Sequence, residues 1–347
     1  MKYSKSYIAA MSYELAPVVV TSAELEERLE PLYRALHMAP GQLQALTGIR
    51  ERRWWEPGYP LSHGAIAAGK KALAAGGVSH ADIGVLIYAG VCREQFEPAT
   101  ACRVAAGLGV RGDTAIYDIS NACLGLLNAI LEVANRIELG QIKAGMVVSC
   151  ESAREINDIM IQRMLEERSM AHFATSLATL TGGSGAVALL ITDKSISGGG
   201  RRRILGGVSQ AAPEHHGLCL WGVQDDGSGR FIQSMRTDAV NVLNYGVELG
   251  IRTWNAFLAE MGWGAADVDQ VVCHQVGAAH QTAILKALGI PEDRDFASYE
   301  FLGNMGTVSL PLTAALADER DVLSPGERVG LLGIGSGLNC LMIGVEW

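Results

Sequence analysis

The chain has 347 residues, of which 49% are hydrophobic and 19% charged, enough apolar content for one large domain or two medium ones. No apolar run approaches the roughly 20 residues of a membrane helix, and the first residues lead into a strand-like segment, so we expect neither a membrane span nor secretion. Lys+Arg 28 against Asp+Glu 37 gives a net charge of -9, so we expect no nucleic acid partner.

The 7 cysteines are spread along the chain without a C-x-x-C pair, which favours reduced thiols in the cytoplasm. His215, His216 and Cys219 lack a fourth ligand at a suitable spacing, so we expect no metal. The segment 64–71 nearly spells a phosphate-binding loop, but Lys71 replaces the required Ser or Thr and the pattern predicts a helix. We therefore expect no metal and no nucleotide cofactor.

Short apolar runs between turn residues predict strands that are buried on both faces. The predicted strands are 85–89, 114–119, 144–150 and 186–191 in the first part of the chain, and 270–274, 328–334 and 338–343 in the second. The two sets are similar, because 73–83 and 258–268 both end a helix with a glycine and an Ala-Asp turn before a strand. The sequence therefore predicts an α/β protein made of two similar halves, with parallel-rich sheets covered by helices.

The glycine-rich and arginine-rich segment 197–203 follows the last strand of the first copy, so we place the halves at 1–197 and 198–347. We interpret its arginines as a solvated linker, because no glycine-rich turn leads from them into a helix. The first copy also contains an insertion at about 152–180. Its apolar stripe fits either a channel for alkyl chains or packing against a core or a dimer partner. The stripe consists of Met160, Ile161, Met164, Leu165, Met170, Phe173 and Leu177.

Cys123 is the strongest single candidate for a catalytic residue. A predicted strand ends just before it, Asn121 is a good N-cap, and the pattern predicts an almost wholly apolar helix over 122–139. Cys123 would then lie in the first turn of a buried helix, where free N–H groups and the helix dipole favour a thiolate. Taken alone, a cysteine that only fills space is the competing interpretation.

The second copy offers partners for this cysteine. His274 ends a predicted strand, and Asn304 lies in Gly-Asn-Met-Gly before another apolar helix. Because the copies repeat one fold, their packing should bring Cys123, His274 and Asn304 to one central site. A cysteine can accept an acyl group while a neutral histidine and an amide N–H stabilise a developing oxyanion. His274 alone is equally compatible with a core histidine.

These residues resemble those of the thiolase superfamily, in the branch of ketoacyl-ACP synthase III. The resemblance covers essentially the whole chain. It rests on Gly-Ile-Arg-Glu-Arg-Arg at 48–53, Asn-Ala-Cys at 121–123, His-Gln at 274–275, Gly-Asn-Met-Gly at 303–306 and Gly-Ile-Gly-Ser-Gly-Leu-Asn-Cys at 333–340.

The resemblance implies a five-layered αβαβα thiolase fold and a homodimer. It also implies that Cys123 is the acyl-accepting nucleophile and that His274 and Asn304 form an oxyanion site. A second oxyanion hole would come from the backbone N–H groups of Cys123 and Ser336.

Glu97 bears on which condensation takes place. It stands just past a predicted strand end, where the resemblance implies no acid in synthases that decarboxylate malonyl-ACP. An enzyme that does not decarboxylate must instead remove a proton beside a thioester, which requires a positioned carboxylate. The sequence looks like the OleA-type head-to-head acyl-CoA condensing thiolases of bacterial long-chain olefin biosynthesis, which implies that Glu97 reaches the partner subunit's active site. An exposed loop acid is the alternative for Glu97.

We therefore expect a cytoplasmic, homodimeric acyltransferase that joins two long-chain acyl-CoAs by non-decarboxylative Claisen condensation, through acyl-Cys123, to a 2-alkyl-3-oxoacyl product. The alternatives are a decarboxylative 3-oxoacyl-ACP synthase III that uses malonyl-ACP, an acyl-CoA thioesterase and a non-catalytic partner subunit. We expect no cofactor besides the acyl-CoA substrate. Arg50 and the arginines at 201–203 are candidates for binding CoA or an acyl carrier protein, and the sequence leaves open the carrier, the chain length and which acyl unit forms the carbanion.

Overall fold

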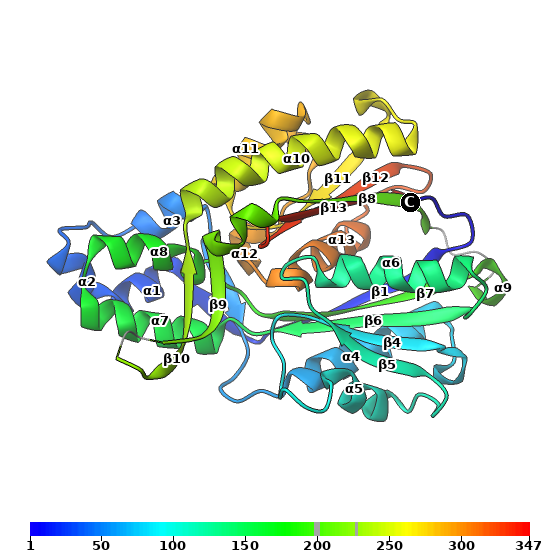
Figure 1. The fold of residues 1–347 in the computed structure, drawn as a ribbon, viewed down its shortest axis with the longest axis horizontal. Coiled ribbons are helices and arrows are strands. Elements are labelled where there is room, and N and C mark those ends of the chain that lie inside the picture. Colours follow the sequence, from blue (N-terminus) through cyan, green and yellow to red (C-terminus); the bar gives the residue numbers. More distant parts are fainter. Residues whose placement is uncertain (198–201, 226–227) are drawn as a thin grey trace.

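Residues 1–197, 202–225 and 228–347 are described in a computed structural model, and nine of their strands form one mixed sheet (Figure 1). Its order is β11-β12-β13-β8-β1-β7-β6-β4-β5. The strands are β1 (Tyr7–Leu15), β4 (Val85–Ala89), β5 (Ala115–Ile119), β6 (Ala144–Glu151), β7 (Gly185–Thr192), β8 (Arg202–Ala211), β11 (Gln270–Cys273), β12 (Arg328–Gly335) and β13 (Asn339–Glu346). Each strand predicted from an apolar run is present, with ends that differ by a few residues at most.

The strand order of the first half is repeated in the second. The order β1-β7-β6-β4-β5 corresponds to β8-β13-β12-β11, and the two series meet where Tyr7 and Ile8 pair with Arg203 and Arg202. Among the described residues, the second half has no full strand that corresponds to β5, and only an isolated bridge between Val271 and Asp295 lies in that position. The two halves of the sheet are therefore arranged alike on either side of the β1–β8 contact.

The prediction of parallel-rich sheets is only partly right. The pairs β4–β5, β4–β6 and β11–β12 are parallel. The pairs β6–β7, β7–β1, β1–β8, β8–β13 and β12–β13 are antiparallel. β12 and β13 are joined by a short turn, and such a turn can connect only antiparallel neighbours. The apolar runs looked alike in both arrangements because parallel and antiparallel strands such as β4, β6 and β7 are all buried on both faces.

Helices and sheet strands stack in five layers (Figure 1), which confirms the predicted αβαβα fold. α4 (Leu61–Gly76) and α5 (Thr100–Leu108) cover the outer face of the first half, and α10 (Ala239–Met261) and α11 (Ala278–Leu288) cover that of the second. α6 (Gly125–Glu138) and α13 (Ser309–Glu319) lie between the halves. The segment that resembles a phosphate loop lies within α4, as the helical pattern predicted.

The two middle helices are shielded to different degrees, although strands from both halves contact each of them. α13 is buried at every position from Ser309 to Ala317, and α6 packs against β4, β5, β6, β7 and β13. Residues of both halves share one apolar cluster around these helices, including Leu127, Val187, Leu316 and Ile343. α6 instead carries a polar stripe of Asn128, Glu132, Asn135, Arg136 and Glu138 that is not buried, so the prediction of an almost wholly apolar helix is wrong for this side of α6.

The inserted segment forms a lobe on the left of Figure 1. α7 (Arg154–Glu167) and α8 (Met170–Leu180) connect β6 to β7, and they pack against α2 (Glu30–Ala35) and the hairpin of β9 (Cys219–Asp225) and β10 (Phe231–Thr237). Ile161, Met164 and Phe173 join an apolar cluster with residues of α1 (Ser22–Arg28) and α2. Of the two interpretations of the apolar stripe, core packing is therefore correct for these residues.

The proposed linker at 197–203 is only partly described. Residues 198–201, which include its glycines and Arg201, lie outside the described residues. Arg202 and Arg203 begin β8, where they pair with Asp318 and with Glu346, the latter at 2.8 Å. The linker interpretation is wrong for these two arginines, because both belong to the sheet.

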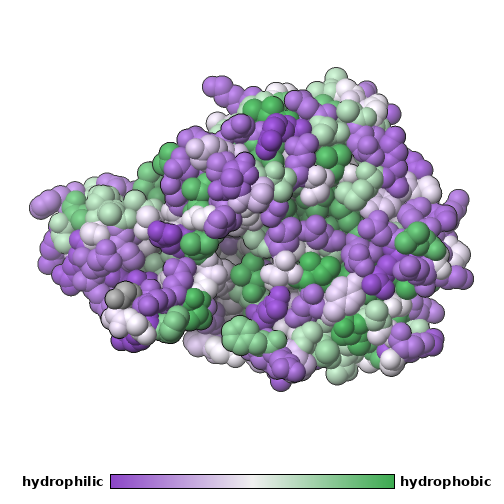
Figure 2. All heavy atoms as spheres, viewed as in Figure 1, coloured by the Kyte–Doolittle hydropathy of each residue, from purple (hydrophilic) through white to green (hydrophobic). Residues whose placement is uncertain are grey.

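The remaining α-helices and strands are short. They are β2 (Val18–Thr21), α3 (Gln42–Thr47), β3 (Glu51–Trp54), α9 (Lys194–Ser197) and α12 (Tyr299–Leu302). In the described part of the chain, no helix is long and apolar enough to cross a membrane. Hydrophilic side chains cover most of the face in Figure 2, and its apolar patches are small and separate.

Candidate active site

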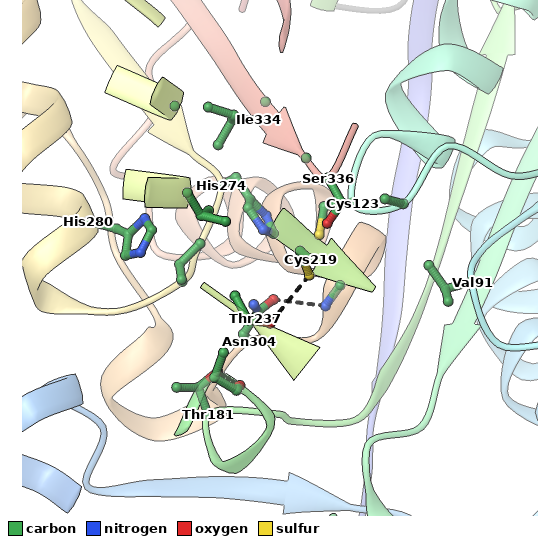
Figure 3. A pocket seen from close by; sticks show the side chains of 18 of the residues that line it. Val91, Cys123, Thr181, Cys219, Thr237, His274, His280, Asn304, Ile334 and Ser336 are labelled. Carbon is green, nitrogen blue, oxygen red and sulfur yellow. Dashed lines mark hydrogen bonds between the residues drawn. The ribbon is translucent and has the colours of Figure 1, made fainter. Parts of the chain in front are cut away.

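Cys123, His274, Asn304 and Ser336 line one cavity of about 470 Å³, although they come from distant parts of the chain (Figure 3). Cys123 precedes α6 and Asn304 precedes α13, so the two side chains lie where the two middle helices begin. A hydrogen bond from the Leu126 backbone N–H to the Thr307 hydroxyl, 2.8 Å long, ties these two helix starts together. The structure thus places the predicted residues at one site between the halves.

The local structure around Cys123 differs from the prediction. α6 begins at Gly125, so Cys123 lies before the helix, and Asn121 is not its N-cap. Asn121 instead donates a hydrogen bond to Asn128 and accepts one from Asn339. Ala122 has a φ of 45°, a left-handed conformation that is uncommon for a residue with a Cβ atom. The chain therefore turns sharply at Ala122 and presents Cys123 at the end of the turn.

The predicted preference of Cys123 for the thiolate form is also wrong in this structure. Burial raises the pKa of the Cys123 thiol to about 12, with smaller contributions in the same direction from the nearby Cys219 and Glu151. Its own backbone N–H acts in the opposite direction but is the weakest influence. Cys123 therefore holds its proton at neutral pH before substrate binds. The sequence pattern indicated a helix start near Cys123, but it did not show that the thiol would be buried away from solvent.

His274 lies directly after β11, and its backbone N–H donates to the Leu332 carbonyl at 2.9 Å. Burial, together with the neighbouring His280, lowers the pKa of His274 to about 4. The imidazole is therefore neutral at pH 7. Its Nδ1 is buried and has no hydrogen-bond partner among the described residues. A neutral ring in this place can donate one hydrogen bond and accept another.

Asn304 is held by its backbone and by its side-chain oxygen. Its N–H donates to the Thr181 carbonyl, and its own carbonyl accepts from Gly183, each at 2.8 Å. Its Oδ1 accepts hydrogen bonds from the Gly306 N–H at 3.0 Å and from the Ser309 hydroxyl at 3.5 Å. Because two donors face Oδ1, the amide –NH₂ group is left to point into the cavity. This group can donate to an oxyanion.

Gly335 and Ser336 bring the turn between β12 and β13 next to Cys123. A Cβ atom on Gly335 would lie only 3.3 Å from the Cys123 nitrogen, so the close approach depends on glycine. Asn339 fixes this turn through hydrogen bonds to the Asn121 side chain at 3.1 Å and the Ser336 carbonyl at 3.4 Å. Figure 3 shows Ser336 beside Cys123, as a shared oxyanion hole requires.

Glu97 does not line the cavity of its own chain. It lies on the loop 90–99 between β4 and α5 and is exposed, and its neighbour Phe96 is 97% exposed. Arg50 does not line the cavity either. Its side chain is exposed and lies 3.7 Å from Glu51. The structure therefore gathers four of the six predicted site residues and leaves Glu97 and Arg50 on the surface of the single chain.

Apolar walls extend from the site in two directions. On one side the wall is formed by the lobe and the β9–β10 hairpin, with Ala153, Ile156, Ala178, Leu220, Trp221 and Met235. On the other side it is formed by α10, α11 and the sheet, with Val242, Leu243, Gly246, Gly250, Ile284, Leu288 and Met342. The apolar stripe of the insertion does not take part in this lining, so the channel interpretation of the stripe is wrong.

Sequence reasoning missed several polar residues of the cavity. Glu151, Cys219 and His280 all line it, and only Cys219 had been considered, as a metal ligand. The alternating patterns of β9 and β10 around a glycine-containing turn would have predicted the hairpin that places Cys219. Glu151 follows an apolar run, and nothing in that run shows that its carboxylate lies in the cavity rather than in solvent at the end of a strand. In the described residues, no three His, Cys, Asp or Glu side chains are grouped to hold a metal ion.

Comparisons with known proteins give the family. Residues 258–347 match the family described as 3-oxoacyl-acyl-carrier-protein (ACP) synthase III, C terminal. The chain is 58% identical to the acyl-CoA:acyl-CoA alkyltransferase of Shewanella oneidensis and 33% identical to that of Xanthomonas campestris, with 100% of both chains covered in each case. This chain belongs to the acyl-CoA:acyl-CoA alkyltransferase, or OleA, family. The beta-ketoacyl-acyl-carrier-protein synthase III of Rhodospirillum rubrum is 29% identical over 96% of each chain.

Solved structures agree with this membership. A structure of Xanthomonas campestris OleA has a TM-score of 0.94 at 33% sequence identity, and covers 100% of this chain and 98% of that one. Variants of that OleA replace one cysteine, one glutamate and one histidine, and its glutamate precedes its cysteine by as many positions as Glu97 precedes Cys123. The resemblance to the thiolase superfamily and its OleA-type members, drawn from the sequence, is confirmed.

Proposed function

We propose that this OleA family member joins two long-chain acyl-CoAs by non-decarboxylative Claisen condensation. The observation that carries the proposal is the grouping of Cys123, His274 and Asn304 at the base of a cavity whose walls are apolar in two directions. Two related alkyltransferases align over the whole chain, and an OleA structure holds lauric acid and lauroyl-CoA. The apolar walls suit two alkyl chains that meet at the thiol.

The first step is acyl transfer to Cys123. The thiol attacks the thioester carbonyl, the bond between that carbon and the CoA sulfur breaks, and the thiol proton ends on CoA. The backbone N–H groups of Cys123 and Ser336 stabilise the oxyanion of this step. Neutral His274 is able to accept the thiol proton and return it to the leaving sulfur. Acyl transfer changes no oxidation state, so the step needs no redox cofactor.

The second step forms the carbon–carbon bond. Glu97 of the neighbouring subunit removes a proton from the α-carbon of one acyl unit, and the carbanion attacks the carbonyl carbon of the other. The bond from that carbon to sulfur breaks, the sulfur takes up the proton, and a 2-alkyl-3-oxoacyl thioester results. The amide of Asn304 and the imidazole of His274 donate hydrogen bonds to the enolate oxygen. Hydrolysis of the thioester then releases the acid.

The role of Glu97 requires a homodimer, and two features support one. β5 lies at the edge of the nine-stranded sheet and is half-buried at every position, so its outer backbone groups are open to another strand. Phe96 stands almost fully exposed beside Glu97 on the same side of the molecule as β5, because the 90–99 loop leads into α5, which packs on β5. Arg50 is our candidate contact for CoA or an acyl carrier protein.

We also propose a reducing, cytoplasmic location, which the seven free cysteines support. We keep the division into halves at 1–197 and 198–347, which the repeated strand order supports.

The test is to give the purified protein a long-chain acyl-CoA alone and to follow CoA release and product mass together. We expect a doubled-chain β-keto acid or the ketone that it forms by losing CO₂. Glu97→Ala should lower condensation about a hundredfold or more while leaving acylation of Cys123 intact. The exposed Glu27→Ala is the matched control. Free fatty acid as the sole product would indicate a thioesterase, and a requirement for malonyl-ACP would indicate a decarboxylative synthase; either result would overturn the proposal.

A further inference from the structure

Glu151 is a buried carboxylate in the cavity that the proposed steps do not use. It ends β6, its exposed fraction is 4%, and it lies among the residues that line the site. Main-chain N–H groups of the neighbouring loop supply its hydrogen bonds: Val91 donates to Oε1 at 2.9 Å and Cys92 donates to Oε2 at 3.0 Å. The two carboxylate oxygens therefore hold two successive residues, Val91 and Cys92, of the loop that follows β4.

Two glycines lie close to the Glu151 carboxylate. A Cβ atom on Gly90 would lie 3.2 Å from Oε1, and one on Gly306 would lie 3.5 Å from it. Glycines thus let both backbone segments approach the carboxylate. Burial raises the pKa of Glu151, while the backbone N–H groups around it, including that of Thr307, lower it. Glu151 is therefore the junction of the 90–99 loop and the turn that follows Asn304.

The same loop is fixed at two further points. The carboxylate of Glu94 accepts hydrogen bonds from the Ser62 N–H at 2.7 Å and from Arg103 at 2.8 Å. At the end of the loop, Asp118 accepts from the N–H groups of the first two residues of α5, each at 2.9 Å. Carboxylates therefore hold the loop at its start, middle and end, whereas Phe96 and Glu97 between them project outward.

We propose that Glu151 is a positioning residue for the condensation step: its buried carboxylate fixes the start of the 90–99 loop and thereby the place of Glu97 in the neighbouring active site. The inference rests on the proposed function and on the proposed dimer. It assigns Glu151 to the chemistry of the other subunit, although the residue lies in the cavity of its own. A hydrogen bond between a main-chain N–H and a charged acceptor is among the stronger ones in proteins, so its loss should displace the loop.

The first variant is Glu151→Gln, which keeps the side-chain length but turns an –NH₂ group toward one of the two N–H donors. We expect condensation to fall about tenfold or more, while the burst of CoA release that reports acylation of Cys123 stays within about threefold. Glu138→Gln is the matched control, because Glu138 also accepts main-chain N–H groups, among them that of Ser4 at 2.8 Å, far from the site. If Glu151→Gln does not fold, Glu151→Asp, with both oxygens on a shorter side chain, takes its place.

Mixed dimers with one working cysteine decide where Glu151 acts. In the first, a Cys123→Ala subunit is paired with a Glu151→Gln subunit, so the loop entering the working site comes from a subunit with normal Glu151. In the second, a wild-type subunit is paired with a subunit that carries both substitutions, so the entering loop is the altered one. We expect nearly wild-type condensation per working site in the first dimer and the full loss in the second.

The same two dimers made with Glu97→Ala in place of Glu151→Gln separate this inference from the proposed function. If they do not show the loss in the second arrangement, the role of Glu97 in the neighbouring site fails, and the positioning role fails with it. If they show it but the Glu151→Gln dimers show equal losses, or a greater loss in the first arrangement, Glu151 acts on its own site and the positioning role is overturned.

Discussion

The polar side chains at the base of the cavity are neutral before substrate arrives. Burial raises the pKa of Cys123 to about 12 and lowers that of His274 to about 4. Both shifts have the same cause, since a dry cavity penalises whichever form is charged. The resting site is thus a thiol beside an imidazole rather than an ion pair. Charge develops only when an acyl-CoA carbonyl lies among the N–H groups that can stabilise it.

The low pKa of His274 makes a prediction about stability. In the unfolded chain the group takes up a proton near pH 6.5, whereas the folded protein resists protonation down to about pH 4. Stability from this group is therefore full above pH 6.5 and is lost as the pH falls toward 4, by about 3 kcal/mol in total. Urea unfolding of wild type and His274→Gln at pH 4.5, 5.5 and 7 measures it.

The difference between the two unfolding series isolates His274 from other buried groups, such as Asp295, whose pKa burial raises to about 6. We expect wild type to lose more stability than His274→Gln on going from pH 7 to 4.5. Parallel pH dependences of the two proteins would show that the imidazole is not buried in its neutral form.

At the scale of elements, α10 and α11 form one wall of the cavity, and two glycines of α10 widen it. A Cβ atom on Gly246 would meet only Ile334, at 3.1 Å, so a side chain there would extend toward the cavity. Gly246→Val should lower turnover of a sixteen-carbon acyl-CoA about tenfold relative to an eight-carbon one, because the pocket loses the space of a few methylene groups. Steady-state CoA release with the two substrates measures the ratio.

The exposed Asn255→Val on the same helix is the control for this prediction, because it adds the same branched side chain outside the cavity. An unchanged preference in Gly246→Val would mean that the alkyl chains do not pass between α10 and α11.

Periodicity and apolar runs were sufficient to predict the buried strands, the two similar halves and the insertion between β6 and β7. They were less informative at the ends of elements. Asn121 has the residue type of an N-cap, but tertiary hydrogen bonds to Asn128 and Asn339 use its side chain, and the helix begins at Gly125. The cavity walls could not be predicted either, because a hairpin pattern in the sequence does not show that β9 and β10 pack beside the site.

At the scale of the whole molecule, the proposed dimer makes a prediction for Phe96. An apolar side chain that is 97% exposed beside Glu97 should become buried against the second subunit. Phe96→Ser should therefore raise the dissociation constant of the dimer about tenfold or more without lowering the thermal stability of the subunit. Sedimentation velocity over a range of concentrations measures the change.

Leu139→Ser is the control for the dimer, because Leu139 is also an exposed apolar residue, at 73%, but lies just after the far end of α6. Equal dissociation constants for wild type and Phe96→Ser would place the dimer interface elsewhere, and Glu97 could then not reach a neighbouring site.

The middle layer of α6 and α13 makes the folding of each half depend on the other. Each helix contacts strands of both halves, and α13 is buried at every position from Ser309 to Ala317. A fragment that ends near residue 197 would leave α6 without its contact to β13, and the complementary fragment would leave α13 without its contacts to β1 and β7. We therefore expect neither fragment to fold independently. The two halves should fold in one cooperative transition, which would bring the Cys123 thiol and the Asn304 amide together in the same step.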